Sequence, residues 1–133
     1  WGPADTGNLT QGIFYTTYSA IIKGINYGRN GLGSIYVFGS GNGGYFDNCN
    51  YDGYANSPYT ITIAAIDSED KSFYFSESCP CILASTYSSG ENGSIYTTDL
   101  GKEGCTTQHS GTSASTAIAA GIIALVLSAN PNL

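Results

Sequence analysis

The hydrophobic positions along the chain fall into two helical stretches and several short strands. In residues 13–25, IFYTTYSAIIKGI, isoleucine and alanine recur near one helical face, which predicts a surface helix. Residues 113–129 are apolar on most faces, which is typical of a helix buried inside a protein. The Asn130-Pro131 pair predicts where this second helix ends.

Two uninterrupted apolar runs predict strands that are buried on both faces. They lie in SIYVFGSGNGG (34–44) and in YTITIAAI (59–66). Weaker patterns at 82–88 and 94–100 predict two more strands, joined by the turn-prone segment SGENG. Strands that alternate with helices predict an α/β sandwich around a parallel sheet, and no repeat or linker divides residues 1–133.

Charge and hydropathy then narrow the classes of partner. Ten acidic residues against four basic ones give a net charge of −6, which argues against a nucleic-acid surface because such surfaces need clustered lysine and arginine. The longest apolar run, residues 117–127, is shorter than the roughly 20 residues that cross a bilayer. We therefore expect this segment to make no membrane contact.

The four cysteines, with the spacing C-x29-C-x-C-x23-C, allow three disulfide pairings. This spacing lacks the C-x2-C knuckles of a zinc site. Asn8 and Asn92 each begin an N-x-[ST] sequon, the acceptor for N-glycosylation. Composition therefore favours an oxidising compartment.

Two short segments carry candidate chemistry. In GTSAS (111–115), Ser113 lies at the predicted start of an apolar helix, where unpaired N–H groups and the helix dipole suit a nucleophile that forms an oxyanion. The alternative is that Ser113 is only a helix N-cap. In SGNGG (40–44), Asn42 follows a buried strand and can aim its amide at a neighbouring site. Its alternative is a glycine-rich turn.

Together with several longer motifs, these segments resemble one known family. The motifs are WGPAD, SGNGGYFDNCNYDGYANSPYTITIAAID, TYSSG, YTTDL and HSGTSAS. They are similar to the kexin/furin branch, the proprotein convertases, of the subtilisin superfamily of serine proteases, over residues 1–133. The resemblance implies a subtilisin-like three-layer α/β sandwich with a mostly parallel sheet, incomplete at its N-terminal side. It also implies Ser113 as nucleophile and Asn42 as oxyanion donor.

The resemblance further implies a substrate pocket and a metal site. In the family, acidic residues lie at the base of an S1 pocket that accepts arginine, and Asp5 and Asp52 correspond to them. The pocket is acidic because a buried guanidinium needs carboxylate oxygens in place of water. Further substrate contacts correspond to Gly39 and, in the S4 region, to Tyr54. Gln11 stands where furin-like enzymes carry an acid, which weakens the expectation of a basic residue four positions before the cleavage site. The calcium ligands implied are Asp5, Asp47 and Glu77.

The same resemblance implies a disulfide between Cys49 and Cys79. Cys105 matches a cysteine whose partner lies outside residues 1–133. Cys81 has no counterpart in the family pattern, and it could pair with Cys105 or stay free.

The family's catalytic aspartate and histidine precede the serine in sequence, and residues 1–133 contain no match for them. The single histidine, His109, lies four positions before Ser113 through an extended segment, which separates the two by roughly 10 Å or more. We therefore expect His109 not to be the base. We expect the chain to be the C-terminal half of a catalytic domain, inactive alone, with the upstream half of the same domain as its partner.

The expected function is that of a fragment of a calcium-dependent serine endopeptidase. It would process proproteins after basic sites, such as Lys-Arg or Arg-Arg, in the secretory pathway. One alternative is a catalytically inactive surface or interaction protein with the convertase fold. Another is a small extracellular binding module held by disulfides, which would fold alone.

Overall fold

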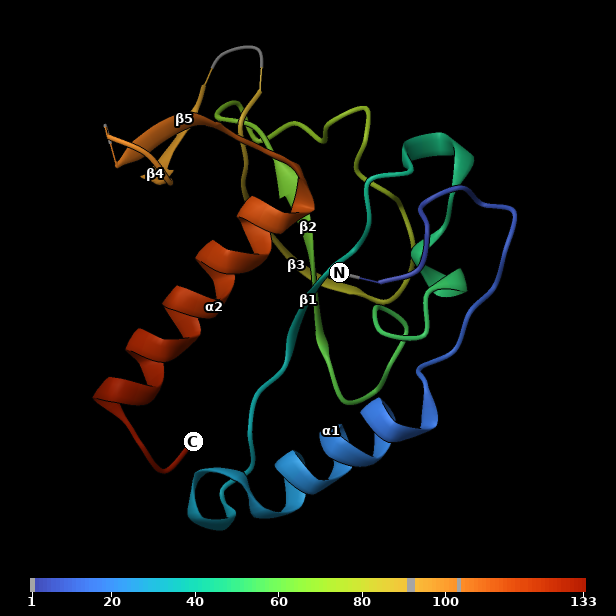
Figure 1. The fold of residues 1–133 in the computed structure, drawn as a ribbon, viewed down its shortest axis with the longest axis vertical. Coiled ribbons are helices and arrows are strands. Elements are labelled where there is room, and N and C mark those ends of the chain that lie inside the picture. Colours follow the sequence, from blue (N-terminus) through green and yellow to red (C-terminus); the bar gives the residue numbers. More distant parts are fainter. Residues whose placement is uncertain (1, 91–92, 103) are drawn as a thin grey trace.

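The structure is a computed structural model of the 133-residue chain, and it describes residues 2–90, 93–102 and 104–133. Trp1 of the WGPAD motif and Asn92 of the second sequon lie outside the described residues. The main elements, shown in Figure 1, are α1 (Tyr15–Tyr27), β1 (Val37–Gly39), β2 (Ile61–Ile66), β3 (Ile82–Tyr87), β4 (Ile95–Thr98), β5 (Cys105–His109) and α2 (Gly111–Ala129).

The centre of the molecule is a parallel sheet with the strand order β1-β2-β3. Val37 pairs with Ile61, and Ile63 pairs with Ala84. The middle strand, β2, is buried at four of its six positions, as its unbroken apolar sequence predicts. The predicted α/β fold with a parallel sheet is therefore confirmed.

Helix α2 covers one face of this sheet, and α1 contacts a tyrosine that points to the other side. Helix α2 contacts all three strands, and Gly39 of β1 faces its first turn. Phe38, which points to the other face because side chains alternate along a strand, stacks on Tyr54 with 5.4 Å between ring centroids. Tyr36 points the same way as Phe38, and its ring lies over Gly24 of α1. The chain thus forms a parallel sheet with α2 packed on one face and α1 on the side to which Tyr36 points.

A two-stranded antiparallel hairpin, β4–β5, stands apart from the parallel sheet. Strand β4 was expected from the sequence, whereas β5 was not, because CTTQH has neither an apolar run nor an apolar alternation. Pairing with β4 orders β5 instead, with Thr98 opposite Cys105 and Ile95 opposite His109. The hairpin leads directly into α2, as Figure 1 shows at its upper left.

Helix α2 runs over 19 residues, which makes it longer than the apolar run that the sequence suggested. By length and composition alone this helix could cross a membrane. The core helix of a soluble protein meets the same two criteria. In this structure, 22% of the most apolar stretch of the helix is buried. The sequence-based expectation that this segment is too short to cross a membrane considered only the apolar residues 117–127. The small polar residues on both sides of that run are helical as well, so the helix is longer. Ile122, Leu125 and Val126 are exposed on this helix.

Candidate active site

Ser113 lies in the first turn of α2, which begins at Gly111. The N-cap position belongs to Ser110, whose side chain makes no capping hydrogen bond among the described residues. The alternative that Ser113 is the N-cap is therefore wrong. Ser113 is exposed, while its neighbours Thr112 and Ala114 are buried at 2% and 1% exposure, so the serine is the residue of this turn that meets solvent.

Asn42 follows β1 and reaches the start of α2. Its Oδ1 accepts hydrogen bonds from the backbone N–H of Thr112, at 2.9 Å, and from the Thr112 hydroxyl, at 3.3 Å. Asn42 thus gives the helix the capping oxygen that Ser110 does not provide. Because Oδ1 is held by the helix, the amide nitrogen is the atom of this side chain that remains to donate to a ligand.

One cavity of about 650 Å³ brings most of the predicted site residues together. Ser113 and Asn42 lie on its wall, and Asp5, Asp52 and Gly39 line it as well. The remaining wall is made by Gly2, Pro3, Val37, Phe38, Gly41, Thr112, Thr116, Ala117 and Ala120. Its wall therefore combines a serine, an amide donor and two carboxylates.

Tyr54 lies behind this cavity and not on its described wall. It is 2% exposed, and its ring stacks on Phe38, which is itself a wall residue. The structure therefore gives Tyr54 a place in the core that supports the wall. Gln11 forms an isolated β-bridge with Asp52, so it lies beside the loop that carries this carboxylate.

Gly39 sets the distance between β1 and α2. A Cβ atom at this position would lie 2.8 Å from Oγ1 of Thr112 and 3.1 Å from Oγ1 of Thr116. The first of these contacts is shorter than a Cβ atom normally makes, so a larger residue would displace the threonine hydroxyls or push the helix away from the strand. The absence of a side chain at Gly39 lets the turn that carries Ser113 lie directly on the strand.

Asp52 is half-buried at one side of the cavity. Burial raises the pKa of its carboxyl, the N–H groups of Tyr54 and Ala55 lower it, and the charge of Asp5 raises it further. Its Oδ1 accepts the Tyr54 N–H at 2.7 Å, which holds the side chain in place. A cationic ligand would supply the positive charge that this environment lacks.

Next to the cavity lies an acidic cluster made of Asp5, Asp47 and Glu77, whose carboxylate oxygens all lie within 4.8 Å of one another. Glu77 is 3% exposed, and one of its oxygens accepts the Gly43 N–H at 2.9 Å. Burial raises the pKa of Glu77 to about 7, and the charges of Asp47 and Asp5 add to the effect against the opposing Gly43 hydrogen bond.

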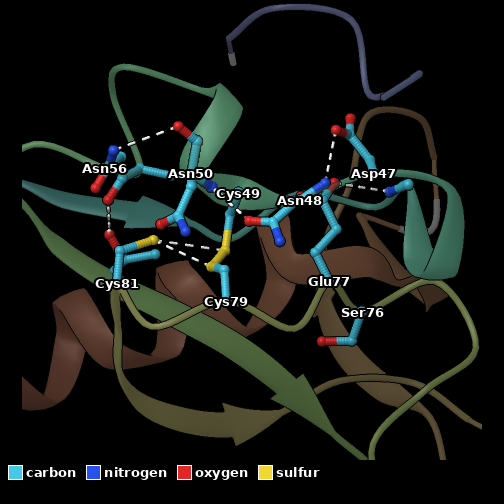
Figure 2. The surroundings of a disulfide bond; sticks show 12 residues. Asp47, Asn48, Cys49, Asn50, Asn56, Ser76, Glu77, Cys79 and Cys81 are labelled. Atoms are coloured by element: carbon cyan, nitrogen blue, oxygen red, sulfur yellow. Dashed lines mark hydrogen bonds between the residues drawn. A yellow bond between two sulfur atoms is a disulfide. The ribbon is translucent and has the colours of Figure 1, made fainter. Parts of the chain in front are cut away.

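This cluster fits a calcium ion. Its three carboxylates and Ser40 line a hollow of about 10 Å³, close to the space that one water-sized atom needs. The Ser40 hydroxyl is buried and has no hydrogen-bond partner in the described part of the chain. Oxygen ligands from separate loops suit a hard cation. Figure 2 shows Asp47 and Glu77 near each other on neighbouring segments.

A disulfide joins Cys49 and Cys79, with 5.7 Å between their Cα atoms, and it links the loops that carry Asp47 and Glu77. This is the pairing that the family resemblance implies. Cys81 and Cys105 are free thiols within the described residues. Of the two alternatives for Cys81, the structure therefore has the free cysteine.

His109 lies at the end of β5 and is not among the residues that line the cavity of Ser113. It lines a separate cavity of about 360 Å³, with Thr97, Thr98, Asp99, Thr106 and Gln108. Its carbonyl accepts a hydrogen bond from the Ser89 hydroxyl. Sequence reasoning missed two contributors to the site, Thr112 and Ser40. Thr112 directly precedes the candidate nucleophile and Ser40 begins the SGNGG segment, but neither residue type by itself indicates a contact with a helix or a cation.

Comparison with known proteins places this geometry in a family. The model of the Subtilase family matches residues 1–133. The chain is 51% identical to Kexin of Saccharomyces cerevisiae, 51% identical to the Dibasic-processing endoprotease of Schizosaccharomyces pombe and 47% identical to human Proprotein convertase subtilisin/kexin type 4. Each match covers the whole chain, which corresponds to 16%, 19% and 18% of those relatives. The chain therefore belongs to the subtilase family.

Proposed function

We propose that the protein carrying this chain is a calcium-dependent serine endopeptidase that cleaves proproteins after basic residues, with Lys-Arg and Arg-Arg as preferred sites. One observation carries the proposal: a single cavity lined by Ser113, Asn42, Asp5 and Asp52. The names of two relatives, a dibasic-processing endoprotease and a proprotein convertase, agree with this chemistry.

Ser113 acts as the nucleophile, and its Oγ attacks the carbonyl carbon of the scissile peptide bond. A histidine base and an orienting acid come from a part of the protein outside residues 1–133, since His109 lines a different cavity. The amide of Asn42 and the backbone N–H of Ser113 donate to the oxyanion that forms. Since Asn42 caps the helix that carries Ser113, donor and nucleophile are fixed relative to each other.

Asp52 and Asp5 bind the basic side chain that precedes the scissile bond. A guanidinium forms charge-assisted hydrogen bonds with carboxylates, and in the correct geometry these bonds repay the cost of taking both charges out of water. The raised pKa of Asp52 shows the cost of its half-buried charge, which a bound cation would offset.

Calcium is held by Asp5, Asp47 and Glu77. A bound calcium ion supplies positive charge that neutralises this cluster and stabilises the surrounding loops. The Cys49–Cys79 disulfide, which joins two of these loops, suits an oxidising compartment, and we infer that the protein works on the lumenal or extracellular side of the secretory pathway.

Replacement of Ser113 by alanine in the full-length protein tests the proposal. We expect turnover of a Lys-Arg peptide to fall to background, while the melting temperature stays within a few degrees of wild type. Ser128→Ala, a change of the same kind at the far end of α2, is the matched control and should leave turnover unchanged. An unaltered rate in the Ser113 variant would exclude Ser113 as the nucleophile, whereas no turnover by the wild-type protein would favour the inactive, convertase-like interaction protein.

A further inference from the structure

We propose that Cys81 is a thiol–disulfide exchange partner of the Cys49–Cys79 bond, so that Cys49 alternates between Cys79 and Cys81. The three sulfur atoms form one cluster, as Figure 2 shows. The Cys81 sulfur lies 3.1 Å from that of Cys79 and 3.5 Å from that of Cys49. A free thiol therefore touches both sulfurs of an existing disulfide.

The local backbone keeps this arrangement in place. Cys79 and Cys81 are separated only by Pro80, which fixes its own backbone dihedral near that of a turn. The N–H of Ile82 donates to the carbonyl of Cys79 at 3.4 Å and closes this turn. Ile82 also begins β3, so the position of Cys81 is fixed by the parallel sheet. The contact among the sulfurs is thus a consequence of the fold.

The exchange needs neither an oxidant nor a reductant. The Cys81 thiol loses its proton, its side chain turns to bring the sulfur in line with the Cys49–Cys79 bond, and this sulfur attacks the sulfur of Cys49. The Cys49–Cys81 bond forms as the Cys49–Cys79 bond breaks, and the electron pair goes to the sulfur of Cys79, which takes up a proton. One disulfide and one thiol are present before and after the step.

Exposure favours attack at Cys49 over attack at Cys79, although Cys79 is the nearer sulfur. Attack at Cys79 would release Cys49, which is 1% exposed, and a departing thiolate is poorly stabilised at a buried position. Attack at Cys49 releases Cys79, which is half-buried and reaches solvent. Burial and the charges of Asp52 and Glu77 raise the pKa of the Cys81 thiol, so exchange in the resting protein is slow.

The exchange changes the covalent link between two loops. Cys49 and Cys79 each lie two residues after a member of the acidic cluster, Asp47 and Glu77 respectively. After exchange, the link on the second loop lies four residues from Glu77, at Cys81. The segment between Glu77 and β3 then has a free thiol in its middle and more freedom to move.

Disulfide mapping of the full-length protein with single cysteine variants tests the proposal. In Cys79→Ser we expect the secreted protein to contain a Cys49–Cys81 disulfide and no free Cys49. Cys81→Ser is the matched control and should keep Cys49–Cys79. The double variant Cys79→Ser/Cys81→Ser should be secreted several-fold less than Cys79→Ser, because it has lost every partner of Cys49. Free Cys49 and free Cys81 in secreted Cys79→Ser would overturn the proposal.

A second measurement avoids variants that fail to fold. The wild-type protein is incubated under native conditions with iodoacetamide, and the labelled cysteines are located by fragmentation in the mass spectrometer. We expect label on Cys81 in some molecules and on Cys79 in others, the latter paired with a Cys49–Cys81 bond. Label that accumulates on Cys81 alone, or on Cys49, would contradict the proposed exchange.

Discussion

The carboxylate of Asp5 accepts a hydrogen bond from the backbone N–H of Asn42, with 2.9 Å between Oδ2 and N. Glu77 does the same for the next residue, Gly43, at 2.9 Å. Two members of the acidic cluster therefore hold the backbone of Asn42, whose side chain caps α2, and of the residue after it. The candidate cation site and the candidate oxyanion donor share this loop, and a change at one reaches the other through a single hydrogen bond.

Removal of calcium should lower both stability and turnover. Without a cation, three carboxylates within 4.8 Å of one another repel, and two of them hold the Asn42–Gly43 backbone. We expect chelation to lower the melting temperature of the full-length protein and kcat for a Lys-Arg peptide, and we expect Glu77→Gln to weaken calcium binding at least tenfold. Glu69→Gln, at an exposed ion pair with Lys71, is the control and should leave calcium affinity unchanged.

The stabilisation by calcium should grow with pH. In the cation-free protein the pKa of Glu77 is about 7, above its ordinary 4.5, so the folded state holds this proton more tightly than the unfolded state. Loss of the proton therefore opposes folding, and stability without calcium falls as the pH rises from 4.5 through 7. The calcium-induced rise in melting temperature should be larger at mildly alkaline than at mildly acidic pH. An equal rise at both would show that Glu77 does not bind the ion.

Two substitutions at Asn42 should separate catalysis from helix capping. Asn42→Asp keeps the oxygen that accepts the Thr112 N–H but removes the amide donor, so kcat should fall by about 10²–10³ while stability changes little. Asn42→Ala removes both functions, so it should show the same loss of kcat and an additional loss of about 1 kcal/mol in stability. Kinetics together with denaturant unfolding of the full-length protein make this comparison, and a normal kcat in Asn42→Asp would exclude the side chain as an oxyanion donor.

Asp52→Asn should reduce selectivity for arginine at the position before the cleaved bond. We expect kcat/KM for an arginine substrate to fall by about 30-fold or more, because a desolvated guanidinium loses one charged partner. Asp70→Asn is the matched control: Asp70 is exposed, its left-handed backbone with φ of 61° also suits asparagine, and the change in charge is identical. Equal losses in the two variants would indicate a general effect of charge and not a specificity pocket.

The exposed apolar face of α2 should be buried in the full-length protein. Leu125 is 73% exposed in residues 1–133, which correspond to no more than about a fifth of the relatives' length. We expect Leu125→Ser to destabilise the full-length protein by about 2 kcal/mol or more. Leu100→Ser, at a loop residue that is 96% exposed, should change stability by less than about 0.5 kcal/mol. Similar small effects at both positions would mean that this face stays in solvent.

Sequence patterns predicted most of the fold because its elements are locally consistent. The apolar run of β2 and the apolar helix α2 appear within a few residues of their predicted bounds. The antiparallel partner of β4 could not be predicted, because the polar sequence of β5 is ordered by its pairing and not by its own propensity. Long-range pairing of this kind leaves no local signal.

The residues of the candidate site could be named from sequence motifs, but the hydrogen bonds and contacts between them could not. The segments that contain Asn42 and Ser113 pointed to a donor and a nucleophile. The bond from Asn42 to Thr112 and the unpartnered hydroxyl of Ser40 depend on how distant segments pack. Tyr54 illustrates the opposite case, since a motif suggested a surface role for a side chain that packing places in the core.

Because Gly39 has no side chain, the helical turn that carries Ser113, the proposed nucleophile, lies close against β1. A Cβ atom there would lie 2.8 Å from the hydroxyl oxygen of Thr112 and 3.1 Å from that of Thr116, so these hydroxyls or the helix would have to shift. The smallest possible substitution would tilt or shift that turn, and with it the angle at which the serine oxygen meets a substrate. In the proposed mechanism the attack geometry therefore depends on a residue that carries no reactive atom, and a Gly39→Ala variant that remains folded would still cleave slowly.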